Sequence, residues 1–297
     1  MKTHILQIVL ILCLPLNAIA AAAEEVMTGG EEVYRVLEGD SLLLISAKFG
    51  VNLERIRNEN SLDPEQPLRP GTELLITTRK IAPAKVDQGL VIDIPGRMLY
   101  YFKAGRLELS CSVGLGRPGW RTPAGGFVIT GKEENPVWHV PASIQAIMQE
   151  KGMPVLTAVP PGPDNPLGKY ALYTSRKGIC IHETIWPTTV YRFRSHGCIR
   201  LLPQDIERLY RDVDDGTPGE LIYEPVKVAV SGDGKVFLQV DPDIYKKARD
   251  PMDVVRRRLD ELGAAGKVDW GKVAAVVAEE AGVAEEVTDI SGSNQTN

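Results

Sequence analysis

The chain has 297 residues, of which 43% are hydrophobic and 25% are charged, and its formal net charge is −5. This length supports a sizeable core and more than one domain, and the composition is that of an ordinary soluble globular protein. Nucleic-acid-binding proteins usually carry a basic surface, so the acidic balance argues against a nucleic-acid partner.

Residues 1–23 have the pattern of a secretory signal peptide. Lys2 provides a positive charge, Ile5–Leu16 is an apolar run, and small residues in Ala18–Ala23 offer cleavage sites. The apolar run is too short for a stable transmembrane helix, and a retained membrane anchor is the alternative interpretation. We therefore expect an exported protein.

Export changes the interpretation of the cysteines. After removal of the signal peptide, Cys111, Cys180 and Cys198 remain. An odd number leaves at least one thiol unpaired in an oxidising compartment, and such a thiol needs a functional explanation. We expect Cys111 and Cys180 to be buried and free, and a disulfide between them is the alternative.

The first folded unit spans residues 33–78. A short strand at "YRV" is followed by a turn in which Ser41 can cap a helix, and a second short helix follows Gly50. A turn at "LRPG" then precedes a closing strand at "TELLI". The expected order is strand, helix, helix, strand.

This segment resembles the LysM module. The matching stretches are "YRV", "GDSL", "AKFGV", the N-x-N of Asn58 and Asn60, and "LRPGTELLI". The resemblance implies binding to glycans that contain N-acetylglucosamine, mainly peptidoglycan. A small βααβ packing domain without a ligand is the alternative.

Residues 79–87 are polar and are expected to form a linker. Residues 88–224 contain short strands separated by turns rich in Pro and Gly, which favours an all-β sandwich or barrel. The expected strands are Leu90–Ile94, Met98–Lys103, Glu108–Val113, Phe127–Thr130, Tyr170–Tyr173 and Ile179–His182. One amphipathic helix that begins near Pro203 interrupts this series.

Residues 225–297 are expected to form a C-terminal extension. Two strands joined by Gly-Asp-Gly predict a β-hairpin, and helices are expected after Pro251 and at Trp270–Ala281. About the last dozen residues are expected to be a disordered tail. The predicted fold is mainly β: a βααβ domain, a β-sandwich or barrel-like domain, and a helical C-terminal extension.

The stretch "YRFRSHGCIRLL" contains the candidate nucleophile, Cys198. His182 and His196, nearby arginines and the start of the following helix can favour its thiolate. A Cys–His pair of this kind serves acyl transfer. Gly197 lets the backbone approach a substrate closely, so its N–H is a candidate oxyanion donor.

Two other interpretations of this stretch involve the same residues. His182, His196, Cys198 and Cys180 include the ligand types of a zinc site, but their spacing is not that of a common zinc finger or ribbon. We therefore expect neither a metal nor a cofactor. A structural turn with a buried thiol is the second interpretation, and export together with the flanking cations makes it less favoured.

"SHGCIRL", with His182 upstream, resembles the catalytic domain of the L,D-transpeptidases of the YkuD family. Gly114–Thr130, Val140–Ile144 and Asn165–Leu172 also match, and the resemblance extends from Gln88 to Tyr245. The part after residue 224 resembles the extension of periplasmic Gram-negative members, which implies a periplasmic location. One departure is Glu183, because many members have glycine after this histidine.

The resemblance implies that Cys198 forms a thioester with a peptidoglycan tetrapeptide stem, releases D-alanine and passes the acyl group to an amine. His182 would be the proton donor and acceptor, and His196 would position the nucleophile. Arg200 would hold a substrate carboxylate, with a surface ion pair as its alternative. Ser195 is expected to hydrogen-bond within the turn, close enough to contact substrate.

The acceptor amine stays open at this level. A second stem would give a 3–3 cross-link, and a lysine of an outer-membrane lipoprotein would give an anchored protein. A cysteine hydrolase on the same scaffold and a wall-binding protein with an inactive catalytic domain are the two alternative functions.

Overall fold

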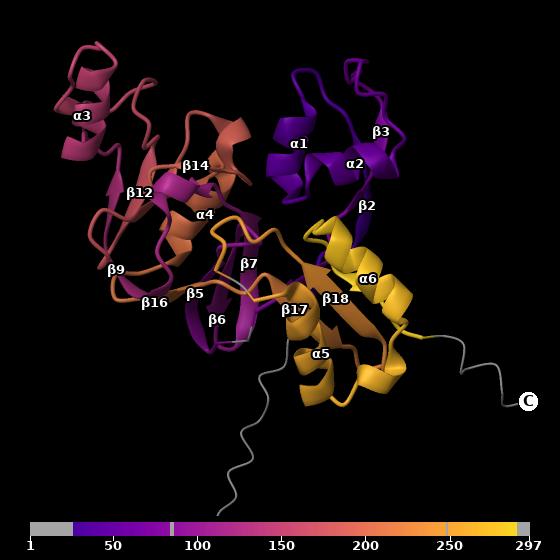
Figure 1. Cartoon of the computed structure of the whole chain (residues 1–297). Coiled ribbons are helices and arrows are strands. Elements are labelled where there is room, and N and C mark those ends of the chain that lie inside the picture. The colour runs from indigo at the N-terminus through magenta and orange to yellow at the C-terminus, as the bar shows by residue number, and fades with distance from the viewer. Residues whose placement is uncertain (1–25, 84–85, 248, 290–297) are drawn as a thin grey trace, which may run out of the picture.

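The computed structural model describes residues 26–83, 86–247 and 249–289. The expected signal peptide lies outside these residues. Figure 1 shows an N-terminal domain in indigo and a C-terminal part in orange and yellow, both beside the strands of a central domain. Within the described part of the chain, no helix has the length and apolar character needed to cross a membrane.

The N-terminal domain has the expected strand, helix, helix, strand order. Its elements are β2 (Glu31–Arg35), α1 (Leu42–Phe49), α2 (Leu53–Glu59) and β3 (Glu73–Thr77), with β2 and β3 antiparallel. The Ser41 hydroxyl accepts a hydrogen bond from Leu44 N at 3.2 Å, so the expected helix cap is present. Gly50 ends α1 in the left-handed conformation, with φ at 64°.

The segment expected to be a linker, 79–87, needs a correction. It contains β4 (Lys80–Ala82), which pairs with β1 (Val26–Thr28), and all three residues of β4 are buried. Lys80 Nζ donates to Tyr191 Oη at 3.2 Å, so even its polar atom is used internally. The polar composition of this segment concealed a strand that packs between the central and C-terminal parts.

The central domain is built on one strongly curved sheet of eight strands. Their order across the sheet is β15 (Ile199–Leu201), β13 (Cys180–Glu183), β12 (Tyr170–Thr174), β9 (Gly125–Glu134), β16 (Pro218–Ile222), β5 (Gln88–Asp93), β6 (Met98–Lys103) and β7 (Arg106–Ser112). Gly114, just after β7, forms two backbone hydrogen bonds of 2.8 Å with Arg200 in β15. The two ends of the sheet therefore meet, and the sheet is close to a barrel.

Helix α4 (Pro203–Asp212) packs against this sheet. Ile206 and Leu209 are fully buried in the main hydrophobic core, as is Val213 just after the helix, which confirms the apolar face expected from the sequence. The central domain also contains these smaller elements: β8 (Leu115–Gly116), η1 (Pro118–Trp120), β10 (Trp138–His139), α3 (Ala142–Glu150), β11 (Ala158–Val159), η2 (Pro187–Thr189) and β14 (Phe193–Ser195). Helix α3, which the sequence analysis did not predict, contains no buried residue.

The C-terminal extension contains the expected hairpin and two helices. Its elements are β17 (Val226–Val230), β18 (Val236–Val240), α5 (Pro251–Glu261), η3 (Ala265–Lys267), α6 (Trp270–Glu279) and β19 (Glu285–Glu286). The expected disordered tail is corrected in part, because β19 pairs with β18 and Val287 is fully buried. Residues 290–297 lie outside the described residues.

The three parts pack tightly on one another. The Ser112 hydroxyl at the end of β7 donates to the carbonyl of Ala47 in α1, and Ala47 also packs on Val190 and Leu202. Arg55 in α2 forms an ion pair of 2.5 Å with Glu285 of the extension. The N-terminal domain is thus fixed beside the end of β7 and beside Leu202, which follows β15.

Candidate active site

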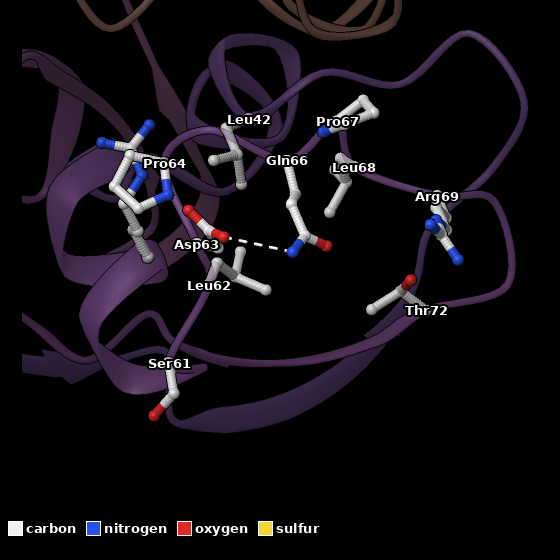
Figure 2. A pocket seen from close by; sticks show the side chains of 11 residues that line it. Leu42, Ser61, Leu62, Asp63, Pro64, Gln66, Pro67, Leu68, Arg69 and Thr72 are labelled. Carbon is white, nitrogen blue, oxygen red and sulfur yellow. Dashed lines mark hydrogen bonds between the residues drawn. The ribbon is translucent and has the colours of Figure 1, made fainter.

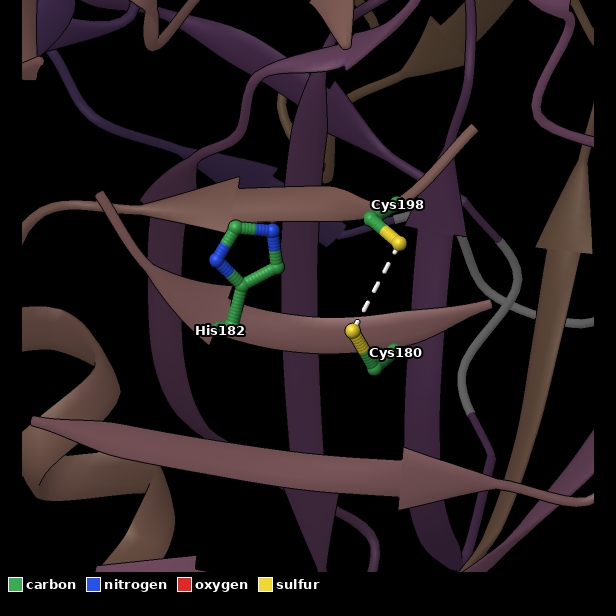
Figure 3. Close-up of side chains that lie close together, drawn as sticks. All are labelled: Cys180, His182 and Cys198. Carbon is green, nitrogen blue, oxygen red and sulfur yellow. Dashed lines mark hydrogen bonds between the residues drawn. The ribbon is translucent and has the colours of Figure 1, made fainter. Parts of the chain in front are cut away.

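Strand pairing brings three chemistry-bearing side chains together. β13 and β15 run parallel, with Ile181 opposite Ile199. Cys180 and His182 are two residues apart and share one face of β13, and Cys198 immediately precedes β15. Figure 3 shows the three side chains directed into the same space. Their ligand-type atoms all lie within 4.8 Å of one another.

His182 is held in a defined orientation. Its side chain is buried, and its Nδ1–H donates a hydrogen bond to the backbone carbonyl of Glu183. That bond fixes the proton on Nδ1 and leaves Nε2 as the acceptor, which lies on the side of Cys198 (Figure 3). The expected base is therefore oriented by a backbone group.

The environment of Cys198 favours its thiolate. Its pKa is well below the ordinary value of 9.0, because the Cys180 thiol donates a hydrogen bond to Cys198 Sγ at 3.5 Å and because His182 lies beside it. Burial opposes these effects but does not outweigh them. The same sulfur–sulfur contact and burial raise the pKa of Cys180. Of the two thiols, Cys198 is therefore the one that ionises more readily.

All three described cysteines are free thiols, so no disulfide joins Cys111 and Cys180. Cys111 is buried in the core of the sheet, and burial raises its pKa, as expected for an unreactive thiol. Cys180 is only partly buried and contacts the nucleophile. Its position two residues before His182 was visible in the sequence, but the contact depends on the strand that pairs with β13.

Cys180, His182 and Cys198 also supply the donor types that zinc binds in proteins. The remaining nitrogen of His182 has the backbone hydrogen bond that usually accompanies a metal-bound imidazole. His196, which the sequence analysis considered as a fourth donor, is not in this group. The set has three donors, and the same atoms are the nucleophile and base of the acyl-transfer interpretation.

Ser195 and Gly197 stabilise the turn that carries Cys198. Ser195 Oγ donates to the carbonyl of Cys198 at 2.6 Å and accepts from Gly197 N at 3.1 Å. Ser195 is 2% exposed, so the structure supports the turn role and not a contact with substrate. Gly197 has a φ of 112°, which requires glycine, but its N–H is already bonded and does not serve as the expected oxyanion donor here.

Thr122 supports the same turn and was missed by the sequence analysis. Its side chain is fully buried, and its hydroxyl donates to the carbonyl of Gly197 at 2.9 Å. The same oxygen accepts from Gly116 N at 2.9 Å, which ties the turn to β8. A lone threonine far upstream gives no sequence signal for such a contact.

His196 points away from the cluster. Its Nε2 lies 3.2 Å from Arg117 Nη2, and its ring meets Trp120 edge-on with centroids 4.9 Å apart. Burial and the charges of Arg117 and Arg200 lower its pKa. His196 therefore favours the neutral form and forms a wall of the site beside the nucleophile turn.

Arg200 lies opposite His182 in the sheet register and faces the site without an acidic partner. Its guanidinium carbon is 5.6 Å from the centroid of the Trp186 ring, and its buried Nε has no hydrogen-bond partner. Within the described residues no carboxylate lies within 4.0 Å of it, so the ion-pair alternative is not what the structure contains. Arg200 can therefore accept a carboxylate from a ligand.

Glu183 has a local role that explains its departure from glycine. Its Oε2 accepts a hydrogen bond from Lys169 N at 2.8 Å. It also packs on Gly168, where an added Cβ would lie 2.5 Å from the Glu183 Cβ. Glu183 thus fixes the turn before β12, and its carboxylate is used there.

The N-terminal domain contains a separate pocket of about 410 Å³, drawn in Figure 2. It lies between the start of α1 and the loop that connects α2 with β3. Gln66 reaches across it and donates to Asp63 Oδ2 at 3.1 Å. The lining residues are Leu42, Arg57, Ser61, Leu62, Asp63, Pro64, Gln66, Pro67, Leu68, Arg69 and Thr72.

Two family descriptions match the chain. Residues 87–228 match an L,D-transpeptidase catalytic domain of the YkuD type, and residues 34–77 match a LysM domain. These matches agree with the two resemblances stated from the sequence.

Two proteins of Escherichia coli strain K12 are similar over most of the chain. "Probable L,D-transpeptidase YbiS" is 33% identical over 219 residues, which cover 72% of this chain and 71% of that protein. "Probable L,D-transpeptidase YcfS" is 31% identical over 229 residues, which cover 74% and 71%. The NMR structure of the Enterococcus faecium L,D-transpeptidase catalytic domain acylated by ertapenem is 25% identical, with a TM-score of 0.37, and covers 46% of this chain and 97% of that one.

Proposed function

Because the chain belongs to the L,D-transpeptidase family, we propose that it acylates Cys198 with a peptidoglycan tetrapeptide stem and transfers that acyl group to an amine. The observation that supports this proposal is the Cys198 thiolate beside the fixed Nε2 of His182. A thiolate paired with an oriented base is the arrangement that acyl transfer through a thioester needs.

In the first step, Cys198 attacks the carbonyl between the L-centre of diaminopimelate and the terminal D-alanine. The Cys198 thiol gives its proton to His182 Nε2 when the thiolate forms, and Nε2 passes this proton to the leaving amine as the carbon–nitrogen bond breaks, so that a thioester remains. The backbone N–H of Cys198 is the donor that we assign to the oxyanion, since the N–H of Gly197 is occupied by Ser195.

In the second step, an acceptor amine attacks the thioester. His182 Nε2 takes the proton of that amine, an amide forms and the Cys198 thiolate is regenerated. Arg200 holds a carboxylate of the stem with its planar guanidinium, and its place opposite His182 in the sheet register, near the Trp186 ring, supports this assignment. His196 and Trp120 form the adjacent wall and limit how the stem enters.

The N-terminal LysM domain would bind the glycan strands of the same polymer. The pocket in Figure 2 is the candidate glycan site, because its lining combines apolar side chains with amide, hydroxyl and charged groups that can hydrogen-bond a sugar. Both activities require the cell wall, so we place the protein in the periplasm after removal of residues 1–23. The acceptor is a second stem, which gives a 3–3 cross-link, or a lipoprotein lysine.

The test is incubation of the purified protein with disaccharide-tetrapeptides, with and without an acceptor amine. We expect a stem adduct on Cys198 by mass spectrometry and dimers that lack one D-alanine. The Cys198→Ala variant should form neither product, whereas Cys111→Ala should form both. If tripeptide monomers are the only product, the enzyme hydrolyses the stem and does not transfer it. Activity in Cys198→Ala would overturn the thioester mechanism.

A further inference from the structure

Cys180 and Cys198 are arranged as a pair of vicinal thiols on neighbouring strands. Their sulfur atoms are 3.5 Å apart, although no bond joins them. The register of β13 and β15 places Ile181 opposite Ile199, so the two cysteines that precede these residues also lie opposite each other. Neighbouring strands are about 4.8 Å apart, within the Cα separations that a disulfide bridges.

The two thiols differ in acidity, which favours Cys198 as the one that an oxidant reaches first. Cys198 carries the thiolate, and Cys180 is the hydrogen-bonded thiol beside it. Both side chains are only partly buried, whereas Cys111 is buried elsewhere in the core. A thiolate that is accessible to oxidant and lies next to a second thiol is the arrangement found in redox-sensitive cysteine sites.

We propose that Cys180 is a resolving thiol, which forms a reversible disulfide with Cys198 when a hydroperoxide oxidises the nucleophile. The Cys198 thiolate attacks the peroxide, the oxygen–oxygen bond breaks, and a sulfenic acid and hydroxide form. Cys180 then loses its proton and attacks the Cys198 sulfur. The sulfur–sulfur bond forms, the sulfur–oxygen bond breaks and water leaves, so the two sulfurs together lose two electrons.

This reaction has two consequences for the site. The disulfide removes the thiolate that the proposed transfer requires, so the oxidised protein is inactive until a thiol reductant restores it. It also intercepts the sulfenic acid before further oxidation to the irreversible sulfinic acid. The disulfide itself does not depend on the proposed function, which enters only through the loss of acyl transfer.

The experiment treats the purified protein with an excess of hydrogen peroxide in the presence of a chelator, because sulfinic acid needs two molecules of peroxide for each thiol, and blocks the remaining thiols before trypsin digestion. We expect the peptides 178–192 and 195–200 to be recovered as one disulfide-linked species. Dithiothreitol should release them and restore acyl-enzyme formation. The linked species is read by mass, so it can be found or excluded even in a protein that transfers nothing.

Two variants make the test specific. Cys180→Ser should give no linked peptide, should accumulate sulfinic acid on Cys198, and should not recover with dithiothreitol. Cys111→Ala is the matched control and should behave as the parent. The proposal is overturned when peroxide converts Cys198 of the parent to sulfinic acid without a linked species, or when Cys180→Ser recovers as fully as the parent.

Discussion

The imidazole of His182 donates through Nδ1 to the backbone carbonyl of Glu183, and its Nε2 thereby remains the acceptor on the side of Cys198. In many nucleophile–base pairs a carboxylate side chain orients the histidine. Here the peptide backbone does so, and the carboxylate of Glu183 is directed to Lys169 N instead. The base is therefore oriented by the peptide backbone and not by a carboxylate side chain.

Replacement of His182 by alanine should reduce kcat/KM for tetrapeptide stems by roughly 10²–10⁴-fold, since proton transfer to the leaving amine is lost. Steady-state kinetics with purified stems measures this effect. His196→Ala is the matched control and should reduce kcat/KM less, because the His196 ring packs on Trp120 and hydrogen-bonds with Arg117. Equal losses in the two variants would contradict the assignment of His182 as the base.

The lowered pKa of Cys198 predicts how its alkylation depends on pH. The rate constant with iodoacetamide should stay near its plateau at neutral pH and decrease only as the pH falls through the lowered pKa. Cys180→Ala removes the hydrogen bond that contributes most to this shift, so the pKa of Cys198 should rise and the midpoint should move to higher pH. Peptide-resolved mass spectrometry distinguishes alkylation of Cys198 from alkylation of Cys111. An unchanged midpoint in Cys180→Ala would show that Cys180 does not lower the pKa of Cys198.

Arg200→Lys should raise KM for the stem roughly tenfold or more while kcat changes little, because a point charge replaces the planar, two-pronged donor. Arg194→Lys offers a control on the same segment, since Arg194 is exposed. Kinetics with stems that retain or lack their free carboxylates measures the effect. A loss confined to kcat would contradict substrate binding by Arg200.

Lys227→Met should lower the free energy of unfolding by about 3–5 kcal/mol, because it leaves two buried carboxylates without their cation. Lys227 Nζ lies 2.7 Å from Asp93 and 2.8 Å from Asp241, and all three side chains are buried. Urea unfolding followed by fluorescence measures the change. Lys235→Met, which removes an exposed ion pair with Glu286, should change it by less than about 1 kcal/mol.

Gln66→Ala should weaken binding to isolated wall sacculi about fivefold, the value of one hydrogen bond, without changing turnover of soluble stems. Gln66 is exposed and lines the pocket of the N-terminal domain, so its removal spares the fold. Co-sedimentation with sacculi measures the binding. Glu65→Ala is the control, because Glu65 is a neighbouring exposed residue outside the pocket. An equal loss of sacculus binding in Glu65→Ala would contradict the pocket as the glycan site.

The sequence predicted those elements whose signals are local. The cap at Ser41, the helix boundary at Gly50 and the Gly-Asp-Gly hairpin each act within a few residues, and the structure has all three. The order of strands in the central sheet is not local, because β16 pairs with β5 across more than a hundred residues of chain. Polar composition also misled the interpretation of β4, whose lysine is buried with its charge hydrogen-bonded.

Among the site residues, too, local signals were predicted from the sequence and contacts between distant segments were not. Cys198 and His182 were predicted because a cysteine in a glycine turn and a histidine at a strand end have a recognisable chemistry. The contact of Cys180 with Cys198 requires the parallel register of β13 and β15, which no short motif encodes. The hydrogen bonds of Ser195 within the turn were expected from the sequence, but the occupied N–H of Gly197, which the sequence analysis offered to the oxyanion, depends on the turn conformation.

The packing of α1 on the end of β7 has a geometric consequence. Because of this packing, the N-terminal domain keeps a fixed position relative to the Cys198 thiol. A glycan-binding site on this domain would therefore lie at a fixed distance from the thiol. If a sugar binds in the N-terminal pocket as proposed, only those stem peptides that project at one offset and one rotation about the glycan strand would come within reach of Cys198. The spacing and handedness of the glycan strands, as much as the chemistry of the stem, would then determine which peptide reacts.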